Sequence, residues 1–225
     1  MQRKIRAVFF LFLVVLLTGP CYGQYRDAGL WLSVSIEKKI ASRTTVLFSE
    51  ECRMMENISQ AGTVFSDLGL MHKWNKYFSA GIFYRFIEKR NLDASYSTRH
   101  RFYADASGKY KTGRWSVSLR ERVQSQVKDY YSSESGRIPE WYLRSKLSLK
   151  VELTRKIIPY AGVELFYQLS NRKGNELDNV RYSAGTEYRF NKRHAIDAGY
   201  LIQQEFHVKN PVTDFVTCLS YNFSF

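Results

Sequence analysis

The chain has 225 residues, a formal net charge of +13 and an aromatic content of 16%. Its four prolines and 13 glycines leave little sequence for disordered linkers, so a single folded domain is expected. The Lys and Arg residues are spread along the chain instead of clustering, which argues against a nucleic-acid-binding surface.

The first 23 residues have the pattern of a secretory signal peptide. A positively charged start leads into the apolar run Ala7–Thr18, which is followed by small residues at the cleavage positions. The run is too short to cross a bilayer as a helix. Pro20 directly before Cys21 argues against a lipoprotein signal. We therefore expect a cleaved segment 1–23 and one mature domain, 24–225.

The mature sequence alternates between apolar and polar residues with period two, which predicts β-strands. The clearest case is Trp141–Thr154, where Leu147 and Leu149 oppose Lys146 and Lys150. The predicted strands exceed the usual five or six residues and suit a tilted crossing of a bilayer. There are eleven: Gly29–Lys38, Arg43–Glu56, Phe65–Trp74, Tyr77–Arg90, Thr98–Lys111, Trp115–Tyr130, Trp141–Thr154, Tyr160–Ser170, Val180–Asn191, Ala195–Phe206 and Thr213–Phe225.

The predicted connections alternate between short and long, as in barrels with short periplasmic turns and longer outer loops. The short ones are Lys39–Ser42, Asn75–Lys76, Lys111–Arg114, Arg155–Ile158 and Lys192–His194. The long ones are Asn57–Val64, Asn91–Ser97, Tyr131–Glu140, Asn171–Asn179 and His207–Val212. The fold predicted is an all-β, antiparallel, up-and-down transmembrane barrel of 10 to 12 strands, with an even number expected when both termini are periplasmic.

The last strand ends at the last residue with an apolar, aromatic face. The alternating residues of this face form the predicted assembly signal: Phe215, Leu219, Tyr221, Phe223 and Phe225. Such a terminal pattern resembles the sorting signature of bacterial outer-membrane barrels. The expected partners are therefore outer-membrane lipid and the barrel-assembly machinery, and the expected location is the outer membrane. The final strand of a soluble sandwich would also alternate, but it rarely stops on an exposed Phe.

Two stretches of the sequence echo one another. Each has a Gly-containing strand, an Asn-Lys turn and a second Gly-containing strand. The key residues are Gly69, Asn75 and Gly81 in the first stretch and Gly185, Asn191 and Gly199 in the second. Asn favours tight turns, and a strand glycine lets a neighbouring side chain approach closely. The echo predicts two similar hairpins.

Strand alternation places many charged residues on the inward face. The predicted lumen-lining residues are Arg85, Arg101, Asp105, Arg120, Arg122, Arg144, Lys146, Lys150, Glu152, Glu164, Glu187 and Arg189. Rings of Arg and Lys favour anions, so one interpretation is a narrow, anion-preferring channel. The other is a lumen plugged by acid–base pairs, which the interleaving of acidic and basic residues favours.

No catalytic, cofactor or metal motif is found. The sequence lacks G-x-S-x-G, H-E-x-x-H, a glycine-rich phosphate loop and C-x-x-C. His72 and His100 fall on lipid-facing positions, where an interfacial role is favoured over catalysis. Cys52 and Cys218 lack the spacing of a disulfide framework or a zinc site, and free thiols are expected.

Short motifs resemble a known bacterial family, domain of unknown function 2490. They are Leu30-Trp31-Leu32, Ile36-Glu37-Lys38, Glu51-Cys52-Arg53, Gly81-x-x-Tyr84-Arg85-Phe86, Arg99–Arg101 and Arg120–Arg122. The resemblance covers nearly the whole mature chain and implies an outer-membrane barrel without an assigned activity.

Three functions remain open from the sequence. The first is a structural barrel or narrow channel, and the second is a barrel enzyme acting on lipid or lipopolysaccharide. The third, a secreted soluble barrel that binds an apolar ligand, is disfavoured by the strand lengths and by terminal Phe225.

Overall fold

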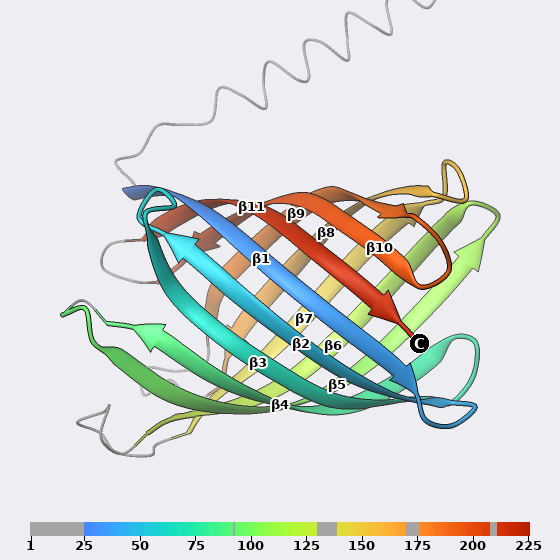
Figure 1. The fold of residues 1–225 in the computed structure, drawn as a ribbon. Helices are drawn as coiled ribbons and strands as arrows, with labels where there is room; N and C mark the ends of the chain where they lie inside the picture. The colour runs from blue at the N-terminus through green and yellow to red at the C-terminus, as the bar shows by residue number, and fades with distance from the viewer. Residues whose placement is uncertain (1–24, 92, 130–138, 170–175, 208–210) are drawn as a thin grey trace, which may run out of the picture.

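A computed structural model describes residues 25–91, 93–129, 139–169, 176–207 and 211–225, which form one closed β-barrel (Figure 1). The predicted signal peptide lies outside the described residues. The strands are β1 (Tyr25–Lys39), β2 (Thr44–Met55), β3 (Gln60–Lys73), β4 (Phe78–Arg90), β5 (Tyr96–Thr112), β6 (Trp115–Lys128), β7 (Glu140–Val151), β8 (Ile157–Gln168), β9 (Glu176–Arg189), β10 (His194–Glu205) and β11 (Val212–Ser224). The predicted all-β barrel and its eleven strands are confirmed.

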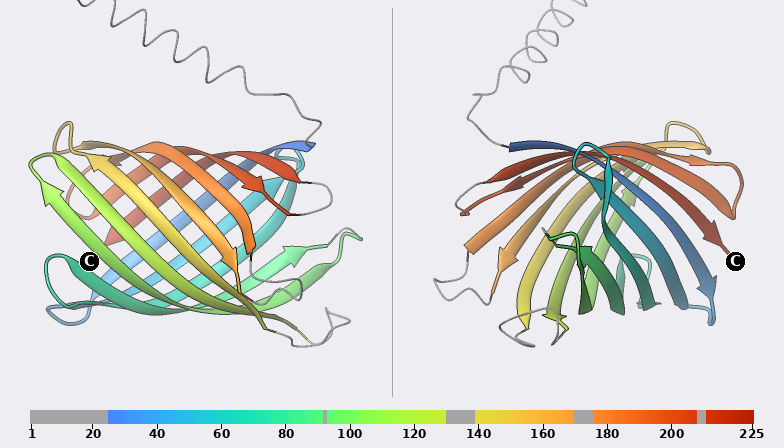
Figure 2. Two further views of the ribbon diagram at one scale, coloured as in Figure 1. Left: turned by 180° about the vertical axis from the view of Figure 1, so that it is seen from behind. Right: turned by 60° about the vertical axis from the view of Figure 1, so that its left-hand side comes forward.

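Each strand pairs with its neighbours in the chain, and all ten successive pairings are antiparallel. The strands are inclined to the barrel axis (Figure 2). We call the end with the C-terminus and the β1–β2, β3–β4, β5–β6, β7–β8 and β9–β10 connections the turn end. The opposite end, where β1 begins, is the loop end.

The barrel closes through a parallel pair, β1 with β11, and this overturns the expected even number of strands. Ser33 is in register with Ser220, and both strands run toward the turn end (Figure 1). A parallel seam lets an odd number of strands close, because the first and last strands no longer need opposite directions. β1 therefore starts at the loop end.

Side chains and the chain end stabilise this seam. Inside the barrel, the Ser33 hydroxyl donates to the Ser220 hydroxyl at 2.6 Å, and the Ser35 hydroxyl donates to the Asn222 carbonyl at 2.5 Å. The backbone N–H of Phe225 donates to the Glu37 carbonyl at 2.9 Å. The last residue of the chain is thus part of the closure.

Two of the predicted loops are wrong in extent. β3 begins at Gln60, inside the predicted loop Asn57–Val64, because this polar stretch pairs with β2. The real connection includes positive φ angles of 54° at Glu56 and Asn57 and 66° at Ile58, a compact turn. Similarly, β9 begins at Glu176, before the end of the predicted loop Asn171–Asn179.

The outer wall is apolar and exposed. Ile82, Phe102 and Leu147 are 67%, 60% and 54% exposed, although all three are large hydrophobic residues in the middle of strands. Trp74 and Trp115 add exposed aromatic rings near the turn end. Apolar outward residues flanked by aromatics are typical of a barrel surrounded by lipid. Within the described part of the chain, no helix is both long and apolar enough to span a bilayer.

The two echoing hairpins have the predicted structure. In each, the side-chain oxygen of the turn Asn accepts two backbone N–H groups, those of Tyr77 and Phe78 for Asn75 and those of Arg193 and His194 for Asn191.

The glycines of both hairpins make room for inward aromatic rings. A Cβ added at Gly69 would lie 1.9 Å from the ring of Phe83. One added at Gly185 or Gly199 would lie 2.6 Å from the Tyr160 hydroxyl. The close approach expected of strand glycines is therefore confirmed.

The outward face of β7 gives the first test. Leu147→Arg places a charge near the middle of the outer wall and should destabilise the barrel by about 2–4 kcal/mol in lipid vesicles. Lys150→Ala removes a half-exposed ion pair and should cost less than about 1 kcal/mol. Urea unfolding of both variants measures the difference, and equal costs would contradict the assignment of the two faces.

Candidate functional site

The centre of the lumen holds arginines stacked against aromatic rings. We call this set the arginine–aromatic belt: Trp31, Arg53, Phe65, Arg85, Tyr103, Arg122, Arg144, Phe166 and Arg181. The guanidinium carbons lie 3.7 Å from the ring centroid for Arg53 on Trp31 and for Arg85 on Phe65. The distance is 3.8 Å for Arg122 on Tyr103.

The belt continues around the barrel to its starting strand. Arg144 lies 4.2 Å from the centroid of Phe166, and Arg181 contacts both Phe166 and Trp31 at 4.5 and 5.1 Å. Cation–π contacts of this kind contribute roughly 0.5–2 kcal/mol each, more when water is excluded. Arg suits them better than Lys because its planar guanidinium stacks while its edges still donate hydrogen bonds.

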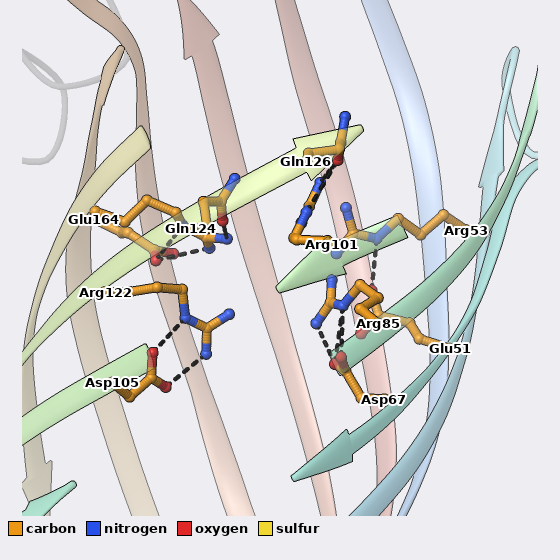
Figure 3. Close-up of polar contacts among 11 residues, drawn as sticks. Glu51, Arg53, Asp67, Arg85, Arg101, Asp105, Arg122, Gln124, Gln126 and Glu164 are labelled. Carbon is orange, nitrogen blue, oxygen red and sulfur yellow. Dashed lines mark hydrogen bonds and ion pairs between the residues drawn. The ribbon is translucent and has the colours of Figure 1, made fainter. Parts of the chain in front are cut away.

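Most belt arginines also bind a carboxylate (Figure 3). Arg122 makes a bidentate pair with Asp105 at 2.6 and 2.7 Å, and both residues are 6% exposed. Arg85 pairs in the same way with Asp67, and Arg53 binds Glu51 at 2.6 Å. The edges of these guanidinium groups are thus satisfied by acids from the same or the neighbouring strand.

Glu164 joins three strands. One of its oxygens accepts from Arg120 at 2.6 Å and from Arg144 at 3.0 and 2.7 Å. Arg144 also donates to the Gln124 side chain at 3.1 Å. β6, β7 and β8 are therefore tied together inside the lumen, in addition to their backbone ladders.

The described residues line two cavities that bear on the site. The first, the central cavity, has a volume of about 530 Å³ and is lined by every belt residue except Phe65, together with cationic residues that include Arg101 and Lys146. The second, the turn-end vestibule, has a volume of about 1080 Å³. Its charged lining is mostly basic, with Glu37, Glu187 and Asp197 against Lys73, Lys109, Lys150, Arg155, Lys156, Arg189, Lys192 and Arg193.

The cavities have no lining residue in common. Phe83 and Tyr160, which line neither, are inward residues that lie toward the turn end from Arg85 and Glu164 along β4 and β8. Phe83 stacks on Tyr103 with centroids 4.7 Å apart, and the Tyr160 hydroxyl donates to Asp197 at 2.6 Å. We call this pair the aromatic partition.

The structure brings most of the predicted lumen residues into these two regions. The central group is Arg85, Arg101, Asp105, Arg120, Arg122, Arg144, Lys146 and Glu164. The turn-end group is Lys150, Glu187 and Arg189, in which Glu187 accepts from Lys150 at 3.0 Å and from Arg189 at 2.6 Å.

Glu152 lies just past the end of β7, at the rim of the turn end, and it lines neither cavity. Its side chain is 39% exposed in the following turn and accepts two bonds from Lys111 at 2.7 Å. The hydrogen bond from Lys111 lowers the pKa of the Glu152 carboxyl.

Sequence reasoning missed the aromatic half of the belt. The period-two pattern placed Trp31 and Tyr103 inward, but it gave no reason to expect guanidinium stacking on their faces. The amides of Gln124 and Gln126 were also missed as partners of Arg144 and Arg101. The sequence feature that could have predicted this stacking is an inward aromatic residue beside an inward Arg on the neighbouring strand.

Three polar residues of the outer wall, His72, His100 and Ser145, each contact a neighbouring polar side chain. His72 contacts the Thr44 hydroxyl at 3.0 Å, and His100 contacts the Tyr84 hydroxyl at 2.8 Å. The Ser145 hydroxyl donates to Glu121 at 2.6 Å. Among the described residues, no hydrogen bond joins an outward Ser to a His, and no cluster of His, Cys, Asp and Glu could hold a metal ion.

Cys52 and Cys218 are both free. Cys52 is in register with outward Leu32, whereas Cys218 is in register with inward Trp31. The two thiols therefore lie on opposite faces of the barrel wall and cannot form a disulfide with each other.

An exposed apolar outer wall around a charged, ion-paired interior defines a transmembrane β-barrel. Comparison with protein families places the chain more narrowly. Residues 28–213 match the family described as "Protein of unknown function (DUF2490)", and the chain belongs to that family. The resemblance seen in the sequence is thereby confirmed.

Solved structures with similar folds are other barrels. The translocator domain of autotransporter NalP from Neisseria meningitidis is 16% identical, with a TM-score of 0.43, 78% of this chain covered and 72% of that chain. The beta domain of the Bordetella autotransporter BrkA is 13% identical, with a TM-score of 0.49, and the match covers 83% of this chain and 86% of that chain. OmpT of Vibrio cholerae is 13% identical, with a TM-score of 0.41, and the match covers 80% of this chain and 60% of that chain. Comparison with curated proteins gave no match.

The buried pair Asp105–Arg122 gives the second test. Asp105→Asn leaves the Arg122 guanidinium buried without a counter-charge and should destabilise the barrel by about 3–5 kcal/mol. The double variant Asp105→Asn/Arg122→Met removes both charges and should recover most of the loss. Unfolding free energies in one detergent decide the matter, and a double variant no more stable than Asp105→Asn would contradict the pairing.

Proposed function

We propose that the protein is an outer-membrane β-barrel whose lumen is closed by its own side chains, so that it does not act as an open pore. The observation that carries this proposal is the arginine–aromatic belt, whose ion pairs and stacked rings join neighbouring strands along the inner wall at the centre of the lumen. Eleven strands enclose a bore between the filled 8-stranded and the open 16- to 18-stranded barrels, so side chains can fill it.

The aromatic partition supports the closed state. Phe83 and Tyr160 are inward residues that line neither of two cavities with no lining residue in common, and Gly69, Gly185 and Gly199 leave room for their side chains inside the wall. A path for ions would have to pass this layer as well as the belt.

Export and assembly are part of the proposal. The signal-peptide pattern of residues 1–23 and the aromatic C-terminal strand support delivery to the outer membrane through the barrel-assembly machinery. The apolar outer wall supports residence in lipid.

Deletion of Phe225 should block assembly. It removes the bond to the Glu37 carbonyl and the ring that packs 4.5 Å from Phe223, both at the closing seam. The measurement is the amount of heat-modifiable protein in the outer membrane, with Phe225→Tyr as the conservative control. If the deletion variant accumulates folded at the wild-type level, the C-terminal strand is not an assembly signal.

A second candidate, a narrow anion-preferring channel, is favoured by the cationic lining of both cavities. The enzyme alternative has less support, because His72, His100 and His194 each contact a hydroxyl and no hydrogen-bonded carboxylate in the described part of the chain.

Planar bilayers separate the two candidates. The wild-type protein should show no steady conductance, whereas Phe83→Ala/Tyr160→Ala should conduct with a preference for anions, since the partition is gone and the cationic lining remains. The matched control is Phe102→Ala/Tyr182→Ala, which removes outward rings and should stay closed.

Steady wild-type conductance would contradict the closed barrel. In that case Arg120→Gln/Arg122→Gln/Arg144→Gln should shift selectivity toward cations, which would establish the channel instead.

A further inference from the structure

We infer that the central cavity is a binding site for a small polyanion, a free solute carrying two or more phosphate groups. The cavity has a volume of about 530 Å³. This falls within the roughly 300–1,000 Å³ typical of small-molecule sites. The site stands whether or not the barrel conducts, because it rests on the charges of the lining and not on an open path.

The lining carries more positive than negative charge. Its cationic residues are Arg53, Arg85, Lys89, Arg99, Arg101, Arg120, Arg122, Arg144, Lys146 and Arg181. The carboxylates that line the cavity or pair with these residues are fewer: Glu51, Asp67, Asp105, Glu140, Glu164 and Asp178. Unpaired charge removed from water is costly, so the lining favours an anion in the cavity.

The shortage of carboxylate partners is clearest at Arg101 and Arg181. Arg101 donates to the Gln126 side chain at 3.0 and 2.5 Å, and no ion pair joins it to a described carboxylate. In Figure 3 the side chains of Arg53, Arg85 and Arg101 converge on one region of the lumen.

Arg181 is held in a similar way. It donates to the Gln203 side chain at 2.5 Å, and Gln203 in turn donates to Asp214 at 3.2 Å. The nearest hydrogen-bonded acid is therefore one amide removed from the guanidinium. Its remaining N–H groups are available to an acceptor in the cavity.

Two further donors in this lining have no partner. The Nε atoms of Arg99 and Arg120 are buried and make no hydrogen bond in the described structure. Buried donors are nearly always satisfied in native proteins, by protein atoms, water or ligand. Phosphate oxygens would satisfy them and would neutralise the surplus charge at the same time.

The chemistry of the donors selects the class of ligand. Planar guanidinium groups bind phosphate in bidentate fashion, which a monovalent halide cannot match. The donors come from β2, β5, β6 and β9, on different sides of the cavity, so a ligand with several phosphate groups reaches more of them than a single phosphate. Apart from Leu201 and aromatic rings the lining is polar and offers little apolar surface to an acyl chain, so a free solute suits the cavity better than a whole lipid.

The experiment uses the purified mature protein in detergent with inorganic tripolyphosphate as the probe. Titration calorimetry should give saturable binding at least tenfold tighter than that of orthophosphate. Thermal unfolding should shift to higher temperature with tripolyphosphate but not with NaCl at equal ionic strength, because a ligand specific for the folded state stabilises it. An equal shift with NaCl, or no saturable binding, would overturn the proposal.

Arg101→Gln/Arg181→Gln should weaken tripolyphosphate binding at least tenfold. Without the probe its unfolding temperature should fall modestly, because the stacking of Arg181 on Phe166 and Trp31 is lost. A purely structural role would lower that temperature and leave the affinity of the folded protein for tripolyphosphate unchanged. The control Lys39→Gln/Arg114→Gln makes the same charge change at exposed positions outside both cavities and should bind as the wild type does. Equal losses in the two double variants would reduce the effect to general electrostatics and overturn the site.

Arg101→Lys keeps the positive charge and tests the site with a milder change, in case the double variant does not fold. It should lose several-fold in affinity, since an ammonium group cannot make the bidentate contact. Full affinity in this variant would contradict the role of Arg101. Failure of the site would show as absent binding in detergent, whereas failure of the closed barrel would show as conductance in bilayers.

Discussion

Closure of the backbone hydrogen-bond network is the constraint on which the rest of this structure depends. In lipid an unpaired backbone group costs several kcal/mol, so the first and last strands must pair with each other. With eleven strands that pairing is parallel, between β1 and β11. The hydroxyl and amide bonds of Ser33 and Ser35 across the seam, and the bond from Phe225 to Glu37, reinforce a pairing that no tight turn holds.

Closure also determines what the interior must contain. A ring of eleven strands encloses more space than small apolar residues fill, and half of every strand faces inward. This chain lines the centre with arginines, whose flat faces pack on Trp31, Phe65, Tyr103 and Phe166 while the edges of most of them bind carboxylates. The arrangement combines volume with charge pairing. Each belt contact joins different strands, so the interior adds cross-links to those of the backbone ladders.

The period-two pattern predicted the strand count and the two faces because alternation is local. Leu147 and Lys146 could be assigned to opposite faces from their neighbours alone. The parallel pairing of β1 with β11 could not be predicted in this way, because it depends on how residues about two hundred positions apart meet when the sheet closes into a barrel. The pairing of Arg122 with Asp105 depends on register and strand tilt, which also lie outside a single-strand pattern. The ends of strands also lie outside such a pattern, since the alternation continues through Glu152 whereas β7 ends at Val151.

The two cavities bear on how this barrel would combine an electrostatic preference for anions with the proposed closure of its lumen. Both the vestibule and the central cavity are lined mainly by cations, so an anion meets a favourable potential on either side of the aromatic partition. Phe83 and Tyr160 themselves carry no charge, and glycines fix how closely they pack to the wall. In the proposed closed barrel, the belt arginines would supply both the preference for anions and part of the closure, whereas Phe83 and Tyr160 would contribute to the closure alone. Removing these two rings would therefore leave the preference for anions in place.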